Sequence, residues 1–537
     1  MARIRMVMLG AALAACGSPA KGTGDGGGTG SGVDAPAAVD AFAGPYRDFP
    51  TGPIIDTPTG GTPTPPNASG LFGDPSSGTP TGGPCLIEPE VGTLYPHNWL
   101  RPRFSWQPVP GQNLFELRLT AANETDPLIV YTTGTSWTMP ADMWTALSTH
   151  IVDAPITVTI RGAVWDGSAL TTPPALGSHG DIAIAPADAP GAIVYWTTSG
   201  GTRLRGFHIG DENVRDIVRP SQAAADTKCV GCHSSTPDGL YVGFSDSPDA
   251  GTGDPTRLAL RTADGTVTEP PFLTAAARTL MARQNQEQPA FSKQHWSAGD
   301  HIAITMWPQN GFQIMWTDLE ATSTAEGIGW GLITRTGDTN PAAYASFAHT
   351  TDQLLYVSSS NVDSGVTVNH GDLATVPYGN RQGGTVAKIS GADLAAYNEY
   401  YPTYSPDDRW VAYNRLADGE RSYNNSQAEV FAIAAAGGTA TRLLANDPPT
   451  CSGRTSPGVT NSWPKWAPEV STIGGKRYYW LTFSSTRIAA GKPQLYVTPV
   501  VEENNTLTTY PALYLWNQPA SESNHTPAWD NFDIPVN

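Results

Sequence analysis

Short apolar runs separated by turn residues fill most of the chain after about residue 85. In the region up to residue 189 these runs are bounded by Pro, Gly, Asn and Asp, and several alternate apolar with polar positions. Such runs predict strands rather than helices. The expected strands include 104–106, 114–119, 129–131 and 156–160. Their spacing is typical of a β-sandwich, which we place at residues 85–189.

A unit made of a strand, a tight turn and a second strand repeats from about residue 190 to residue 537. Its clearest copy is 401–413, where Tyr404-Ser405-Pro406-Asp407 joins two apolar runs. Looser copies are anchored at Pro237, Pro289, Ser346, Trp463 and Pro527. Successive anchors, with Tyr401 as that of the clearest copy, are roughly 52 to 64 residues apart, which fits a four-stranded propeller blade with loops.

The last copy has one strand before the sequence ends, and one strand cannot form a blade. Strand-like runs that precede the first copy, at 193–196, 204–207 and 214–218, can supply the others. We therefore expect six blades and a ring closed by a shared blade. In that blade the C-terminal strand is innermost and residues 192–219 lie outside it, so that no sheet edge is left open.

Two resemblances to known families follow from these motifs. The aromatic-Ser-Pro-Asp turn, followed by the Gly437-Gly438 hairpin, resembles the TolB-like β-propeller repeat over about residues 190–537. The strand of Trp106 and its Pro-rich approach are similar to a fibronectin type III or Ig-like module. The implied fold is all-β, with a sandwich followed by a six-bladed TolB-like propeller. The TolB resemblance implies a cofactor-free scaffold that binds a protein or cell-envelope partner through its channel face.

The composition fits a folded chain with many turns, because it includes 56 Gly, 47 Pro and 39% hydrophobic residues. The formal net charge of −18 argues against binding to a phosphate backbone. An acidic surface is more useful for keeping an exported protein soluble.

The first sixteen residues predict an export signal. Arg3 and Arg5 precede a short apolar run, and Leu13-Ala14-Ala15-Cys16 follows it. That tetrad resembles the bacterial lipobox, which implies that residues 1–16 are a lipoprotein signal and that Cys16 is lipidated. Gly17 after the cysteine resembles outer-membrane lipoproteins, on either the periplasmic or the surface face. The alternative is an ordinary signal peptide with an unrelated cysteine.

Residues 17–84 are rich in Gly, Pro, Thr and Ser and have almost no apolar periodicity. We expect a disordered tether there, with the membrane reached through the lipid anchor alone. Cys85 and Cys451 remain outside any motif. They can form one disulfide in an oxidising compartment, or be two separate buried thiols.

The strongest chemical motif is Cys229-Val230-Gly231-Cys232-His233, whose spacing is that of c-type haem attachment. In this interpretation Cys229 and Cys232 bind the haem covalently and His233 is the proximal ligand of the iron. The function would then be electron transfer or redox sensing with an unknown redox partner. Three alternatives stay open: a Cys229–Cys232 disulfide or redox dithiol, a zinc site, and no cofactor at all.

No cytochrome domain surrounds this motif, because strand signals resume directly after His233. The propeller itself would have to provide the walls and any distal ligand. The neighbouring inner strands offer two candidates, His525 and Met281.

Motifs of hydrolases, zinc proteases and phosphate-binding loops are missing from the sequence: it has no Gly-x-Ser-x-Gly elbow and no His-Glu-x-x-His. We therefore expect an electron carrier or binding protein rather than an enzyme, without a nucleotide cofactor and without a nucleic-acid partner.

Overall fold

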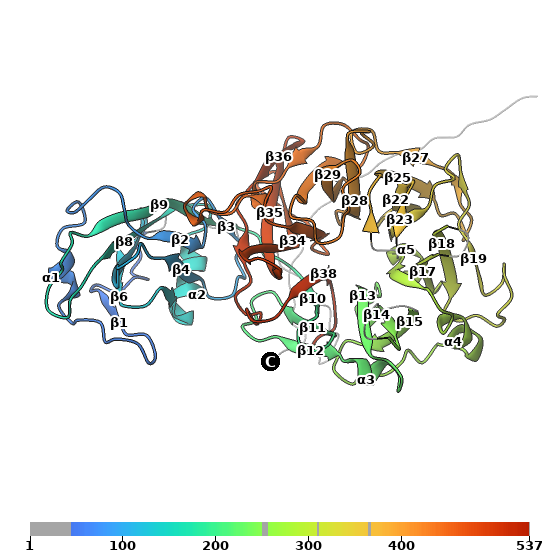
Figure 1. Cartoon of the computed structure of the whole chain (residues 1–537), viewed down its shortest axis with the longest axis horizontal. Coiled ribbons are helices and arrows are strands. Elements are labelled where there is room, and N and C mark those ends of the chain that lie inside the picture. Colours follow the sequence, from blue (N-terminus) through green and yellow to red (C-terminus); the bar gives the residue numbers. More distant parts are fainter. Residues whose placement is uncertain (1–43, 250–255, 309–310, 364–366, 536–537) are drawn as a thin grey trace, which may run out of the picture. The chain divides into compact units, whose positions relative to one another are not determined.

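The structure is a computed structural model that describes residues 44–249, 256–308, 311–363 and 367–535 (Figure 1). These residues form an all-β fold, a sandwich followed by a β-propeller, as the sequence predicts. The export signal with Cys16, and residues 17–43 of the expected tether, lie outside the described residues.

The sandwich consists of two sheets, with the strand orders β1-β6-β5-β8-β9-β3 and β2-β4-β7. The four strands named from the sequence lie within β4, β5, β6 and β8, and their alternating side chains, such as Leu117 and Val158, are fully buried. The bounds are β1 (Ile54–Asp56), β2 (Cys85–Glu88), β3 (Leu94–Tyr95), β4 (Arg103–Gln107), β5 (Leu114–Ala121), β6 (Leu128–Thr132), β7 (Ser136–Thr138), α2 (Ala141–His150), β8 (Ile156–Ala163) and β9 (Ala175–Ile184).

The expected tether boundary at residue 84 is wrong for residues 44–84. This segment contains β1, which pairs in parallel with β6, and the short helix α1 (Ala68–Phe72). Phe49 and Phe72 are only 2% and 1% exposed. A segment too polar to form its own core can still fold when its few apolar side chains join a core that already exists. Composition alone does not reveal that core.

Six antiparallel sheets of the described chain follow one another between residues 192 and 530 and form the propeller. They are β38-β10-β11-β12, β13-β14-β15, β16-β17-β18-β19, β21-β22-β25-β27, β28-β29-β30-β31 and β32-β34-β35-β36. The bounds are β10 (Ala192–Thr197), β11 (Arg203–His208), β12 (Arg215–Val218), β13 (Cys229–Ser235), β14 (Tyr241–Ser247), β15 (Arg257–Thr262), β16 (Glu287–Phe291), β17 (Ile302–Trp307), β18 (Gln313–Asp318), β19 (Trp330–Leu332), β21 (Ala342–Phe347), β22 (Gln353–Ser359), β25 (Gly371–Pro377), β27 (Ala387–Lys388), β28 (Tyr397–Tyr404), β29 (Trp410–Ala417), β30 (Glu429–Ala434), β31 (Thr441–Arg442), β32 (Asn461–Trp466), β34 (Lys476–Ala489), β35 (Lys492–Glu503), β36 (Thr506–Thr509) and β38 (Asn524–Asp530).

Minor elements lie in the connections between these sheets. They are α3 (Pro220–Ala223), α4 (Ala275–Met281), α5 (Lys293–Ser297), η1 (Leu444–Asn446), η2 (Thr450–Ser452), β20 (Arg335–Thr336), β23 (Val362–Asp363), β24 (Thr367–Val368), β26 (Gly384–Thr385), β33 (Ser471–Ile473) and β37 (Leu513–Tyr514).

The ring closes through the C-terminal strand, as expected. β38 pairs antiparallel with β10, with Val194 opposite Ala528 and Ala192 opposite Asp530, and β11 and β12 follow outward (Figure 1). The inner strands β13, β16, β21, β28 and β32 each contact the next, and β38 contacts both β32 and β13. Every inner strand therefore packs against a neighbour on each side, and the shared sheet joins the start of the propeller to its end.

A bulge interrupts the pairing of each inner strand, and it was not expected from the sequence. In every case a residue other than glycine adopts a left-handed backbone, with φ between 27° and 62°. These six residues are Cys232, Gln288, Tyr344, Tyr401, Trp463 and Thr526. A bulge re-aims the side chains beside it, so the six positions form an equivalent set around the ring.

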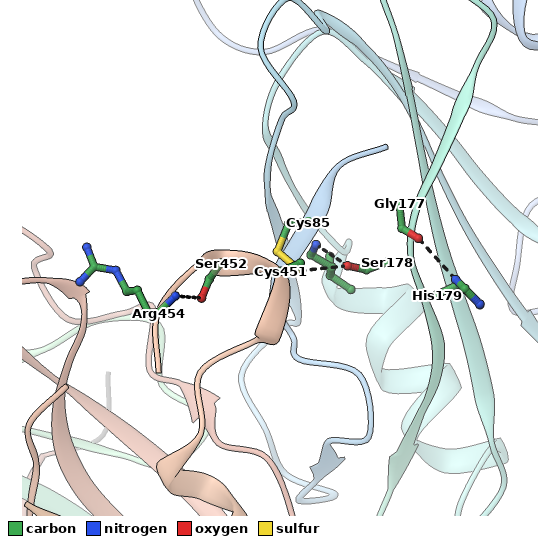
Figure 2. The surroundings of a disulfide bond; sticks show 8 residues. Cys85, Gly177, Ser178, His179, Cys451, Ser452 and Arg454 are labelled. Atoms are coloured by element: carbon green, nitrogen blue, oxygen red, sulfur yellow. Dashed lines mark hydrogen bonds between the residues drawn. A yellow bond between two sulfur atoms is a disulfide. The ribbon is translucent and has the colours of Figure 1, made fainter. Parts of the chain in front are cut away.

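A disulfide joins the sandwich to the propeller. Cys85 at the start of β2 is bonded to Cys451 in η2, between β31 and β32 (Figure 2). The hydroxyl of Ser178, on β9, lies 3.5 Å from the sulfur of Cys451 and accepts a hydrogen bond from the backbone N–H of Leu86. Of the two possibilities for these cysteines, the structure has the disulfide.

Candidate functional site: the central channel

A cavity of about 180 Å³ lies at the centre of the ring. All six inner strands contribute to its wall, each through its left-handed residue and the residues that follow. The most prominent wall is aromatic: the rings of Tyr401 and Trp463 stack with centroids 3.6 Å apart, and Tyr344 meets Tyr401 edge-on at 4.4 Å. The cavity therefore combines an apolar wall with polar groups from several strands, which is typical of ligand sites.

The two motif cysteines lie on β13 but face different surroundings. Burial raises the pKa of the Cys229 thiol, while the nearby hydroxyl of Thr202 opposes this rise. Cys232 occupies the bulge and lines the central cavity. Burial raises the pKa of Tyr344, Tyr401 and Tyr423, and in each case the Cys232 thiol adds to the rise. Cys232 therefore faces the tyrosines of the channel, and neither motif cysteine is in a disulfide.

His233 is turned into the protein and is only 9% exposed. Its Nε2 lies 2.9 Å from the carbonyl oxygen of Val194 on β10, and because a carbonyl only accepts, Nε2 carries the proton and donates. Its Nδ1 is buried and has no hydrogen-bond partner among the described residues. Burial lowers the pKa of His233 to about 4, so the imidazole is neutral at physiological pH.

Two further basic residues lie near His233. His525 on β38 is 5% exposed, and burial together with His233 lowers its pKa to about 4. Lys465 on β32 lines the cavity, and its charge contributes to lowering the pKa of His233. The structure thus brings His525 close to the motif, as the sequence predicts. Met281 is elsewhere: it ends α4 and packs in an apolar cluster with Leu258 and Leu273.

The residues as they are placed do not fit a haem. The Nε2 of His233 carries a proton and has no lone pair for iron, and the two thiols face different surroundings. The cavity of about 180 Å³ is also smaller than the roughly 300–1,000 Å³ of pockets for drug-sized ligands. Binding a macrocycle here requires β13 to rearrange.

No set of three or more His, Cys, Asp and Glu side chains within the described ranges is arranged to hold a metal ion. Within the same ranges, no helix is long and apolar enough to cross a membrane.

Sequence reasoning missed Lys465 and the bulges. A signal for the bulges was present: a proline follows the left-handed residue in four of the six inner strands, at Pro289, Pro402, Pro464 and Pro527. Proline inside a sheet is confined to edges and bulges, so this repeated proline marks the position. His233 occupies that position in β13. No comparable sequence signal distinguishes Lys465 from a surface lysine.

Comparisons with known proteins add little to this site. Neither a scan of protein-family models nor a search of curated proteins finds a match. Among solved structures, a puromycin-hydrolyzing peptidase of Mycobacterium tuberculosis is 13% identical over 66% of this chain and 51% of its own, with a TM-score of 0.31. An ancestral GH74 enzyme is 13% identical over 61% of this chain and 39% of its own, with a TM-score of 0.36. Hydrazine synthase of Kuenenia stuttgartiensis is 12% identical over 47% of this chain and 75% of its own, with a TM-score of 0.25.

The matched part spans about half the length of the peptidase. Sequence identities this low can indicate only the fold. TM-scores this low support no conclusion about the activity, ligand or partner of this chain. The chain is therefore identified by its own topology, as an all-β protein in which a sandwich precedes a closed β-propeller.

Proposed function

We propose that this chain is an exported binding protein whose propeller receives a protein or cell-envelope partner at the mouth of its central channel. One observation carries the proposal: the inner strands converge on a single cavity that joins stacked aromatic rings to buried polar groups. Such a cavity is the first candidate for a binding site in an uncharacterised fold. The TolB-like repeat supports a partner of the cell envelope.

Tyr423 offers the means of testing this proposal. It lies in the connection between β29 and β30, is 38% exposed, and is close enough to Cys232 for the thiol to contribute to the rise of its pKa. A photoreactive amino acid at position 423 is expected to cross-link one partner in intact cells. The matched control is position 328, where Ile328 is 55% exposed beside β19, away from the cavity wall. No adduct at 423, or the same adducts at both positions, would contradict the proposal.

A second candidate is the haem-bearing electron carrier or redox sensor with Cys229, Cys232 and His233 as its attachment site. It is favoured by the position of both thiols and the imidazole on one inner strand, and by the buried Nδ1 of His233, which has no hydrogen-bond partner among the described residues. For this function the Nε2–Val194 hydrogen bond must be replaced, and His525 is the remaining candidate for a distal ligand.

Covalent haem is simple to detect. The chain is co-expressed with a haem-ligation system, denatured, and stained for peroxidase activity on the gel. Under the second candidate the wild type stains and the Cys229→Ala/Cys232→Ala double variant does not. A wild type without stain rejects the haem and leaves the binding function in place.

Anchoring at the outer membrane through a lipidated Cys16 is a separate proposal, supported by the lipobox-like tetrad. Cells grown with labelled palmitate are expected to incorporate label into the wild-type chain and not into Cys16→Ala. An unlabelled wild type that fractionates with the soluble envelope proteins would contradict it.

A further inference from the structure

The basic residues of the channel are unusual for an acidic protein. The formal charge of the chain is −18, yet the cavity wall contains two lysines, Lys293 and Lys465, and a single carboxylate, Asp530. Lys293 and Asp530 neutralise each other, because the Nζ of Lys293 lies 3.4 Å from Oδ1 of Asp530. Lys465 is left as the one cavity charge that the described residues do not balance.

Lys465 has no hydrogen-bond or ion-pair partner in the described part of the chain, and burial alone lowers its pKa to about 8. It stays predominantly charged at neutral pH. The side chain is partly buried, and loss of part of the hydration of an ammonium group without a partner costs free energy. A ligand anion would offset that cost.

The position of Lys465 in the ring explains why it reaches the cavity. Lys465 lies two residues after the left-handed residue of its strand. The equivalent residues of the other inner strands are all small: Ser234, Ala290, Ser346, Thr403 and Ala528. Because the five equivalent side chains are short, they leave room in the channel for the long side chain of Lys465.

The neighbours of Lys465 are donors or neutral groups. β38 lies between β32 and β13 in the ring, and on it His525 is neutral. On β13 the Nδ1 of His233 is buried and has no hydrogen-bond partner in the described part of the chain, and this imidazole becomes a second donor when it is protonated. The only carboxylate of the wall is already occupied by Lys293.

We propose that the central cavity binds a small monocarboxylate, with Lys465 as its counter-ion and the aromatic wall beside it. A single ammonium group flanked by neutral imidazoles matches one negative charge better than the higher charge of a phosphate group. The small cavity limits the ligand to the size range of acetate or benzoate. This site uses the cavity of the proposed function, but it requires no protein partner.

The test uses the full purified chain and its own fluorescence, because Trp463, Trp466 and Trp529 line the cavity. Acetate and benzoate are titrated at constant ionic strength, with chloride and inorganic phosphate as matched anions. We expect saturable binding of a carboxylate with a dissociation constant of about 1 mM or below. Chloride and phosphate are expected to give no saturable change.

Two lysine variants assign the site. Lys465→Met is expected to weaken carboxylate binding by about 10-fold to 100-fold, as the loss of a charged hydrogen bond predicts. Lys492→Met, at an exposed position outside the cavity wall, is expected to bind within a few-fold of wild type. Unfolding midpoints of both variants confirm that they are folded. Equal binding by Lys465→Met and wild type would overturn the proposal.

A second measurement on the wild type does not depend on any variant. Only protonated Lys465 attracts an anion, so the affinity for benzoate is expected to fall about 10-fold per pH unit above pH 8. A pH-independent affinity between pH 7 and 10, saturation by chloride or phosphate equal to that by benzoate, or no saturable response at all would each overturn the proposal. Because no partner protein is present, such a failure leaves the cross-linking test of the proposed function unaffected.

Discussion

The inner strands β13 and β28 have the same backbone and different chemistry. In each, a left-handed residue forms the bulge, and a hydroxyl residue four positions later begins the turn into the next strand. Thr236 donates to Oδ1 of Asp238 at 2.6 Å and accepts the backbone N–H of Tyr241 at 3.1 Å. Ser405 donates to Asp407 in the same way at 2.8 Å, and accepts the backbone N–H of Trp410 at 3.0 Å.

The turn aspartates also make equivalent contacts with the following sheet. The second carboxylate oxygen of Asp238 accepts a hydrogen bond from the indole of Trp296 at 2.8 Å. That of Asp407 accepts one from the hydroxyl of Tyr479, also at 2.8 Å. Both turns therefore bond to the next repeat of the ring, Asp238 to α5 and Asp407 to β34, although only β28 has the clear sequence repeat.

The two strands differ at the bulge and just after it. β28 has Tyr401-Pro402, and β13 has Cys232-His233 at the same two positions. The proline has no titratable group, whereas His233 crosses to β10 and donates to Val194. The comparison shows that a motif typical of haem attachment can occupy the bulge positions that every inner strand of this propeller needs for its backbone. The predictions below test this equivalence.

The largest difference is expected from truncating the bulge side chain itself. Tyr401→Ala removes a buried ring stacked on Trp463 and should lower the free energy of unfolding by about 3–5 kcal/mol. Cys232→Ala removes one partly exposed sulfur and should cost about 1 kcal/mol or less. Urea denaturation of both variants measures the difference. Equal losses would mean that the two bulges do not differ in packing.

The next largest effect is a loss of stability in acid, which is expected from His233 on β13 and has no counterpart at Pro402 on β28. The pKa of His233 is about 4 in the folded chain and about 6.5 when unfolded, so the unfolded state binds more protons between these values. Stability therefore falls as pH drops from 6.5 to 4, by up to about 3 kcal/mol from this residue. His233→Gln retains an N–H donor for Val194 and should lose less stability over that range than wild type. Parallel curves for the two proteins would contradict the buried neutral imidazole.

The turn hydroxyls are expected to give similar losses in both strands. Thr236→Ala and Ser405→Ala each leave a buried backbone N–H without its acceptor, at a cost of about 1–3 kcal/mol. Thermal unfolding of the two variants is the measurement. A loss in Ser405→Ala alone would show that the degenerate copy does not use its turn in the same way.

The smallest effect tests the backbone of β13. Cys232 has a φ of 27°, which glycine adopts without a steric penalty. Cys232→Gly should therefore be more stable than Cys232→Ala by about 0.5–1 kcal/mol, although glycine is normally the less stable of the two in a strand. The opposite order in chemical denaturation would mean that the left-handed bulge is not maintained in solution.

Much of the fold could be predicted from local sequence patterns. The sandwich strands and the turn at Ser405 follow from short apolar runs and turn residues, because strand formation and tight turns depend on neighbours in sequence. The closure of the ring by β38 follows from counting the repeats, because the last copy has a single strand and unassigned strands precede the first copy. The pairing of Cys85 with Cys451 remained open, because 366 residues separate them and no local pattern connects them.

The site was less predictable, because it depends on contacts between distant residues. The motif spacing of Cys229, Cys232 and His233 is a local property, but the proton on Nε2 of His233 is determined by Val194 on another strand. The isolation of Lys465 depends on five small residues from five other strands. The folding of residues 44–84 likewise depends on a core that those residues do not build.

The Cys85–Cys451 bond has a consequence for how this chain responds to proteases. It encloses most of the sandwich and four of the six propeller sheets in one covalent loop. A single cut in any exposed connection between the two cysteines leaves both products attached, and they separate only after reduction. A molecule cut once in this way would thus run as a single full-length band on a non-reducing gel, and as two fragments after reduction.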